Sequence, residues 1–152
     1  MAPRQTVLPL AYRTFFLIIE PISALVGAFY AHFRQNEYLA MTAHSSFVRV
    51  PLGTSIVMSQ LANLYLLFAL NEALVLRSTG DLRVWNTVLF VLLIADFGHL
   101  YSVSSLGLWV YGDVSQWNAI DWGNVPFVYL GATMRIAFLA GVGLGPQSKS
   151  KK

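Results

Sequence analysis

The chain has 152 residues, a length that suits a single domain. Apolar residues make up 56% and charged residues 11%, against roughly 25% charged residues in an ordinary soluble domain. The net charge of +3 does not indicate a nucleic-acid partner, because the basic residues form no stripe. The absence of cysteine excludes disulfides, thiolate chemistry and cysteine-ligated metals. The composition therefore indicates a protein of the lipid bilayer.

Four apolar stretches are long enough to cross a bilayer as helices, which takes about 20 residues. The first begins with an apolar run near Leu8 that is too long for the core of a signal peptide. Short polar connectors with glycine and proline separate the stretches, and Trp and Tyr lie near their ends as in an interfacial belt. We therefore predict an all-α four-transmembrane-helix bundle, a single integral membrane domain with spans at 11–33, 54–76, 85–110 and 125–144 and a disordered basic tail at 145–152.

The basic residues predict the orientation of this bundle. In a four-span topology the N-terminus, the second connector and the C-terminus share one side. That side holds Arg4, Arg13, Arg77, Arg83, Lys149, Lys151 and Lys152, whereas the other holds Arg34 and Arg49. The positive-inside rule then places both termini in the cytosol. The C-terminus is not a KDEL-type signal, and we take the endoplasmic reticulum as the default membrane.

The first span carries an acid at membrane depth. Glu20 lies nine residues from the cytosolic start of the span, or roughly 14 Å deep. A charge there costs roughly 2.5–3.5 kcal/mol, and such groups by default face a bundle interior or a wet cavity. Pro21 lacks an N–H, which frees the carbonyl of Leu17 and leaves it in need of another donor.

The second span combines amides with an acid. Gln60, Asn63, Leu67 and Asn71 fall on one stripe at the helical period, which suits hydrogen bonds to a polar ligand or a water chain. An equally weighted alternative is that these amides bind neighbouring helices. Glu72 is about 100° off the stripe and four residues from the cytosolic end of the span, so we expect it at the cytosolic mouth.

The third span carries a second deep acid. Asp96 lies eleven residues from the cytosolic start, roughly 16 Å deep, and His99 shares its face three residues on. Asp96 and His99 alone do not make a metal site, and we predict no metal and no cofactor. A simple hydrogen bond to another helix is an equal alternative for His99. In the following connector, Asp121 either caps a helix or lies at the lumenal mouth.

The fourth span carries a deep cation. Arg135 lies nine residues from the cytosolic end, at the same depth of roughly 14 Å as Glu20. Three acids against one certain cation leave a carboxyl without an ionic partner, and such a group is held neutral. One ionised and one neutral carboxyl make an acid–base pair, which Arg135 would orient. The alternative is an ion-pair network that only fixes helix packing.

Short motifs support a family assignment along nearly the whole chain. They are Leu8-Pro9-Leu10, Tyr12-Arg13, Phe16, Glu20-Pro21, Ser23-Ala24, Gly27-Ala28, Ala95 to Tyr101, Trp117-Asn118, Asp121 to Asn124, and Arg135. The chain thereby resembles a family of small fungal integral membrane proteins of unknown function. Proteins similar to these accompany polyketide synthases and flavin monooxygenases, as in aurovertin- and citreoviridin-type polyketide pathways. The resemblance implies hydrolysis or cyclisation of an epoxide on a polyene.

The polar residues are compatible with that chemistry, which needs an acid on the oxirane oxygen and a base on water or on an internal hydroxyl. We assign Asp96 as base or acid, Glu20 as its complement, Arg135 as the orienting group and His99 as a hydrogen-bond partner. The expected partners are a lipophilic small-molecule substrate and the bilayer, with a homodimer or a complex with pathway enzymes left open.

Two other classes of function stay open. The first is a non-catalytic sterol- or lipid-binding protein, similar in outline to the emopamil-binding and sigma-2 receptor group, which also places acids inside a small membrane bundle. The second is an assembly factor for other membrane enzymes. A transporter is disfavoured, because four spans without a repeat offer little for alternating access.

Overall fold

The computed structural model describes residues 8–46 and 49–145, and this part of the chain is helical with no strand, as predicted. The basic residues Arg4, Lys149, Lys151 and Lys152 and nearly all of the predicted tail lie outside the described residues. The α-helices are α1 (Leu10–Thr14), α2 (Glu20–Phe33), α3 (Gln35–Thr42), α4 (Leu52–Leu70), α5 (Leu82–Ser102), α6 (Ala119–Asn124) and α7 (Pro126–Leu139).

Two π-helical and four 3₁₀ segments connect or extend these helices. The π-helical segment η1 (Phe15–Ile19) joins α1 to α2 without a break, and η2 (Asn71–Val75) extends α4. The 3₁₀ segments are η3 (Leu76–Ser78), η4 (Val103–Leu106), η5 (Leu108–Tyr111) and η6 (Val114–Gln116).

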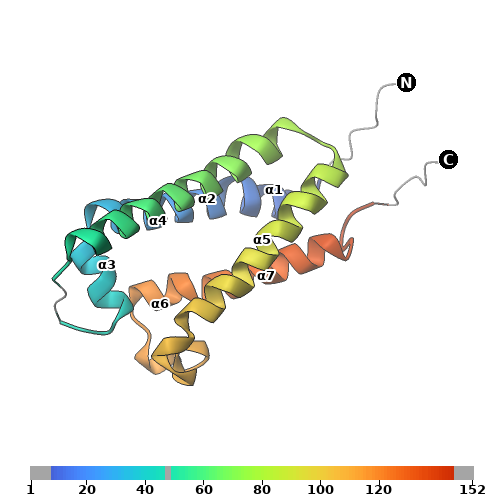
Figure 1. The fold of residues 1–152 in the computed structure, drawn as a ribbon. Coiled ribbons are helices and arrows are strands. Elements are labelled where there is room, and N and C mark those ends of the chain that lie inside the picture. Colours follow the sequence, from blue (N-terminus) through green and yellow to red (C-terminus); the bar gives the residue numbers. More distant parts are fainter. Residues whose placement is uncertain (1–7, 47–48, 146–152) are drawn as a thin grey trace.

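The long helices form two antiparallel pairs (Figure 1). α2 packs mainly on α4, and α5 packs mainly on α7, while the short helices α3 and α6 meet at the end where the two pairs are capped by loops. The two ends of the described chain lie together at the opposite end. There the hydroxyl of Tyr12 donates a hydrogen bond to the carbonyl of Val142 over 2.9 Å.

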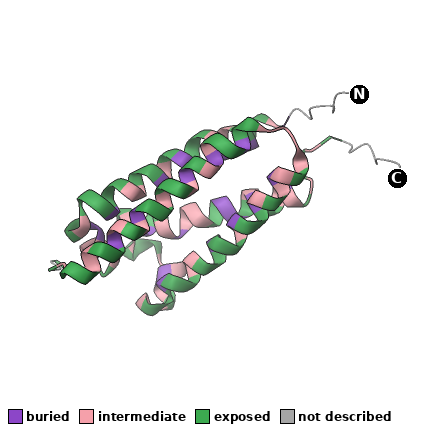
Figure 2. Ribbon diagram, turned by 45° about the horizontal axis from the view of Figure 1, so that its top comes forward, coloured by how far each residue is buried: buried purple, intermediate pink, exposed green. Residues whose placement is uncertain are grey.

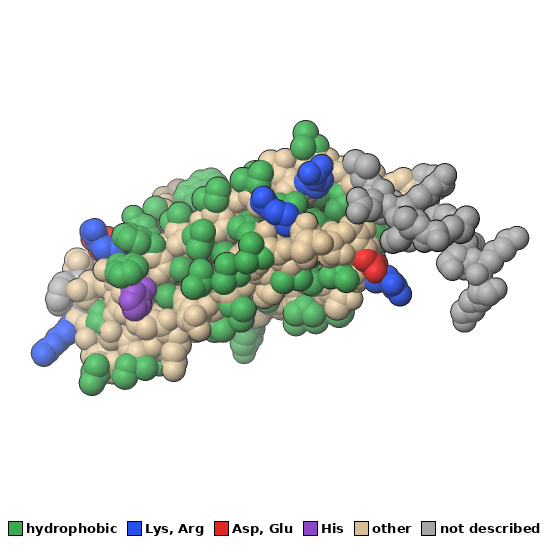
Figure 3. Space-filling model, turned by 90° about the horizontal axis from the view of Figure 1, so that it is seen from above, with side chains coloured by type: hydrophobic (Ala, Val, Ile, Leu, Met, Phe, Trp, Pro, Cys, Tyr) green, Lys and Arg blue, Asp and Glu red, His purple; other side chains and the backbone are tan. Residues whose placement is uncertain are grey.

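Three helical segments are long and apolar enough to cross a membrane: Leu10–Phe33, Leu52–Ser78 and Leu82–Leu106. Large apolar side chains are exposed on these segments. Figure 2 marks exposed residues along the long helices, and Figure 3 shows hydrophobic side chains spread over the face that it draws. Such a surface is unfavourable in water but suits a hydrocarbon solvent. The three segments match three of the predicted spans in place.

The third predicted span begins and ends earlier in the chain than predicted, and the helix of the fourth is shorter than predicted. α5 ends at Ser102 rather than Val110, because the chain passes through 3₁₀ segments and Gly107 at φ +99°. α7 ends at Leu139, ahead of Gly141 and Gly143 at positive φ. Its 14 residues extend for about 21 Å, which is less than the roughly 30 Å of a hydrocarbon core.

The largest apolar core lies between the two helix pairs, towards the end with the described termini. Phe16, Trp85 and Phe138 are almost fully buried there, and the Trp85 and Phe138 rings stack at 5.6 Å. A second core joins α2, α3 and α4, and a third lies among the loops after α5.

Candidate functional site

Arg135 is the centre of a buried network of three carboxylates. Its Nη2 donates to Oε1 of Glu20 over 2.6 Å and to Oε1 of Glu72 over 3.3 Å, and its Nη1 donates to Oδ2 of Asp96 over 2.8 Å. The side chains of Arg135 and Glu72 are fully buried, whereas 7% of Glu20 and 9% of Asp96 stay exposed. The structure thus brings together the three residues that depth counting put at one level, and it adds Glu72.

The network joins the two helix pairs. Glu20 opens α2 and Glu72 lies in η2 after α4, so the first pair supplies these two acids. Asp96 in α5 and Arg135 in α7 come from the second pair. Charge-assisted hydrogen bonds from one guanidinium to three helices are strong and directional. They fix the position of each helix relative to the others at this level.

Both glutamates lie at π-helical turns. The N–H of Glu20 bonds to the carbonyl of Phe15, five residues back, and Pro21 offers no N–H to the carbonyl of Leu17. Arg77 satisfies that carbonyl from the second span, with Nη2 donating over 2.7 Å. The Leu17 carbonyl thus has the donor that we expected it to need, although this donor is an exposed arginine and does not come from the bundle interior. π-Turns are rare and recur at functional sites, because they rotate a side chain out of the α-helical register.

The predicted position of Glu72 at the cytosolic mouth is wrong. The structure buries it completely on the guanidinium of Arg135. The helix continues to Ser78, two residues beyond the predicted end of the span, so Glu72 lies deeper than expected. The π-helical segment that begins at Asn71 also rotates it away from the α-helical position assumed from the sequence.

Gly131 and two aromatic rings shape the space around the guanidinium. A Cβ on Gly131 would lie 2.7 Å from Nη1 of Arg135 and 3.2 Å from Oε1 of Glu20, so only glycine leaves room for this ion pair. Phe16 and Phe68 lie 5.6 and 5.7 Å from Cζ of Arg135, within the range of cation–π attraction. The sequence analysis named Phe16 only as part of a family motif, and it did not single out Gly131 or Phe68.

The network contains more acidic side chains than basic ones. Three carboxylates and one guanidinium would sum to −2 if all were ionised, in a site with little access to water. Two glutamates that share one nitrogen repel each other, and the single guanidinium does not offset the charge of all three acids. Oε2 of Glu20, Oε2 of Glu72 and Nε of Arg135 are buried without a hydrogen-bond partner among the described residues. The site therefore keeps unused hydrogen-bonding capacity on two carboxyl groups and on the guanidinium.

His99 lies apart from this network in its hydrogen bonding. It contacts Asn124 at the end of α6, and its Nε2 is buried without a partner. No hydrogen bond in the described part of the chain joins it to Asp96 or Arg135. The described residues also contain no group of three or more His, Asp or Glu that could hold a metal ion.

The amide stripe of the second span does not line this site, contrary to our expectation. Gln60 and Asn63 are exposed on the outer face of α4, and Asn71 is only half-buried. The helical period correctly identified a face, but that face points away from the bundle. Glu72 lies on the inner side instead.

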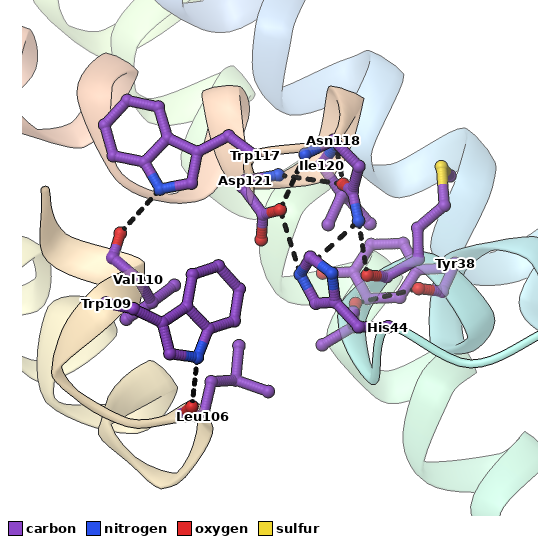
Figure 4. A network of polar contacts seen from close by, with 11 residues as sticks. Tyr38, His44, Leu106, Trp109, Val110, Trp117, Asn118, Ile120 and Asp121 are labelled. Carbon is purple, nitrogen blue, oxygen red and sulfur yellow. Dashed lines mark hydrogen bonds and ion pairs between the residues drawn. The ribbon is translucent and has the colours of Figure 1, made fainter. Parts of the chain in front are cut away.

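Asp121 belongs to a second polar cluster at the far end of the bundle (Figure 4). It forms a capping box with Asn118 at the start of α6, as the capping alternative predicted. Its Oδ2 accepts from the backbone N–H of Asn118 over 2.8 Å and lies 3.0 Å from Nε2 of His44. His44 has a positive φ of 51°, and its ring meets that of Trp109 edge-on at 4.8 Å. This cluster joins α3 to α6 and shares no residue with the Arg135 network.

A comparison with protein families finds one family model that matches nearly the whole chain. The model described as "Domain of unknown function (DUF7704)" matches residues 5–145. The chain belongs to this family. No curated protein and no solved structure matches it. The matched range contains every member of the Arg135 network and of the far-end cluster, so both belong to the family domain.

Proposed function

We propose that this protein is a membrane-embedded acid–base enzyme that opens an epoxide on a lipophilic intermediate, by hydrolysis or by cyclisation. The observation that carries the proposal is the Arg135 network, in which three carboxyl groups from three helices share one guanidinium. Intramembrane ionisable groups are costly, and their default explanation is functional. Acid-assisted epoxide opening is one reaction that two carboxyl groups can catalyse, with one as the acid and the other as the base.

The exposed fractions of the four network side chains distinguish the groups that would contact the substrate from those that would only position them. Glu20 and Asp96 keep some exposure and are proposed to contact the substrate, whereas Glu72 and Arg135 are fully closed in and act as positioning groups. A neutral carboxyl of the pair donates its proton to the oxirane oxygen as the C–O bond breaks. The ionised carboxylate takes a proton from water, whose oxygen forms the new C–O bond. A proton then returns between the two acids, and the product is a diol with one water more than the epoxide.

Cyclisation uses the same groups. An internal hydroxyl replaces water as the nucleophile, and the product is a cyclic ether isomeric with the epoxide. The outer surface of the long helices is apolar, so a polyene would approach laterally from the bilayer. The proposed setting is a four-span bundle, with α6 and α7 together as the fourth span and both termini in the cytosol. The choice of an epoxide rests on the resemblance to proteins of aurovertin- and citreoviridin-type pathways.

The test is turnover of an epoxide-bearing polyene by the full chain in microsomes. Hydrolysis in isotopically labelled water places one labelled oxygen in the product, whereas cyclisation places none. Asp96→Asn and Glu20→Gln should each lower the rate by about 10²–10⁴-fold, the usual contribution of a general acid or base. Asp113→Asn and Glu37→Gln make the same chemical changes at exposed carboxylates outside the network and should leave the rate unchanged. Near-normal product from both network variants would refute the proposal.

A second candidate is a sterol- or lipid-binding protein without turnover. The burial of the network favours it, because Arg135 and Glu72 are fully buried and Glu20 and Asp96 are exposed by only 7% and 9%. In that case the network only holds the bundle together. The purified protein would retain a photoreactive sterol, and it would form neither diol nor ether from any epoxide offered.

A further inference from the structure

The outer face of α4 carries two amide side chains that nothing in the described chain satisfies. Gln60 lies two residues from Met58 and from Ala62, which are both buried, so at about 100° per residue it points away from the core. Asn63 is exposed beside it. Neither amide makes a hydrogen bond with any residue that the structure describes.

Both amides lie at the depth of hydrocarbon if the chain spans a membrane, as the proposed function assumes. Gln60 is eight residues and Asn63 eleven residues from the start of α4 at Leu52, which is about 12 and 16 Å along the helix. The hydrocarbon core is about 30 Å thick and offers no hydrogen bonds. Amides in this layer bind to polar groups of another helix.

The exposed residues around the amides form a heptad seam. Ile56, Gln60, Asn63, Leu67 and Leu70 follow one another at intervals of four, three, four and three residues, and all five are exposed. This alternation is the pattern by which two parallel helices pack side chains into each other's gaps. A polar residue within such a seam specifies the register of the pair. Green marks exposed residues along this helix in Figure 2.

We propose that this seam of α4 is the interface between two copies of this chain, related by a twofold axis along the bilayer normal. Two copies inserted in the same orientation place identical residues at identical depth. Each amide carries both a donor and an acceptor, so Gln60 and Asn63 pair with their own counterparts. The twofold contact uses the same patch on both copies, as an isologous interface does. A second copy necessarily brings matching amides to both levels, which is the reason for assigning it as the occupant of the seam.

Cysteine cross-linking in membranes tests the geometry. The chain has no cysteine, so each single-cysteine variant reports on one position. Leu67→Cys places the thiol in the seam and leaves both amides intact, and it should form a disulfide-linked dimer on mild oxidation. Ile94→Cys on α5 is the matched control, because Ile94 is 56% exposed and Leu67 is 54% exposed. Equal cross-linking of both variants would indicate random collision and would overturn the proposal.

Energy transfer between labelled copies in lipid vesicles tests the amides. Gln60→Leu combined with Asn63→Leu should weaken self-association about tenfold, which corresponds to two modest interhelical hydrogen bonds. Thr87→Leu replaces an exposed polar residue of α5 and should leave association unchanged. Wild-type protein that resists carbonate extraction yet stays monomeric at every lipid dilution would overturn the proposal. Protein that is washed out by carbonate would instead refute the membrane placement of the proposed function.

Discussion

Gly131 and Arg135 lie one turn apart on α7, and a Cβ on Gly131 would come within 2.7 Å of Nη1 of Arg135. The guanidinium cannot move aside without losing a carboxylate, because Glu20, Glu72 and Asp96 hold it from three helices. The network therefore requires glycine at position 131, although glycine has no side chain that could take part in it.

Gly131→Ala should lower the stability of the protein and its activity. The helix gains about 1 kcal/mol from alanine, but overpacking costs about 1–3 kcal/mol, so the net loss is expected at about 0–2 kcal/mol. Gly98→Ala on α5 is the control, since a Cβ there meets nothing within 4 Å. It should raise the melting temperature in detergent, whereas Gly131→Ala should not. A stabilised Gly131→Ala variant with full activity would show that the guanidinium has freedom to shift.

Removal of Arg135 should be far more damaging than removal of any single acid. Arg135→Met leaves three buried carboxyls without a cation, and breaking a buried ion pair in this way costs about 3–5 kcal/mol. Loss of monodisperse protein in size-exclusion chromatography is the expected readout. Glu72→Gln keeps a hydrogen-bond acceptor beside Nη2 and removes part of the acid excess, so it should stay folded. The reverse ranking of these two variants would contradict the proposed charge arrangement.

Arg77 and Pro21 should be energetically coupled through the carbonyl of Leu17. Arg77→Met removes the donor to that carbonyl, and the expected cost is about 0.5–1.5 kcal/mol. Pro21→Ala restores a backbone N–H that can take its place. Arg77→Met should therefore cost less in the Pro21→Ala background than alone, as measured by a double-mutant cycle of unfolding free energies. Strict additivity would mean that the two residues do not serve the same carbonyl.

The sequence predicted the helical fold and the meeting of Glu20, Asp96 and Arg135, because apolar length and residue depth are one-dimensional properties. It misplaced Glu72, since the end of the helix and the π-turn at Asn71 are set by packing. It identified the stripe of Gln60 and Asn63 but not its direction, because periodicity alone does not say which face is buried. Gly131 escaped notice, since its role is to leave space for groups that meet only in the folded chain.

Contacts between residues far apart in the sequence could not be predicted either. His44 and Asp121 come from a loop after α3 and from α6, and each has a local explanation as a surface residue or a helix cap. Only the docking of α3 on α6 brings them to 3.0 Å. Their contact therefore makes a separate prediction about the far end of the bundle.

Asp121→Asn should weaken the contact between α3 and α6 and leave the Arg135 network intact. The carboxylate is 1% exposed and binds both the backbone N–H of Asn118 and the ring of His44. The amide weakens both contacts at an expected cost of about 1–3 kcal/mol. Amide hydrogen exchange should rise in α3 and α6 and stay unchanged around Arg135.

Asp113→Asn is the matched control for this experiment. Asp113 also caps a turn, and hydrogen bonds from Ser115 and Gln116 hold the pKa of its carboxyl below the ordinary value. It is exposed and binds only its own loop, so its replacement should change exchange in residues 113–116 alone. If Asp121→Asn likewise affected no more than its own turn, the contact with His44 would not hold α3 against α6. If exchange rose around Arg135 instead, the two polar clusters would form one cooperative unit.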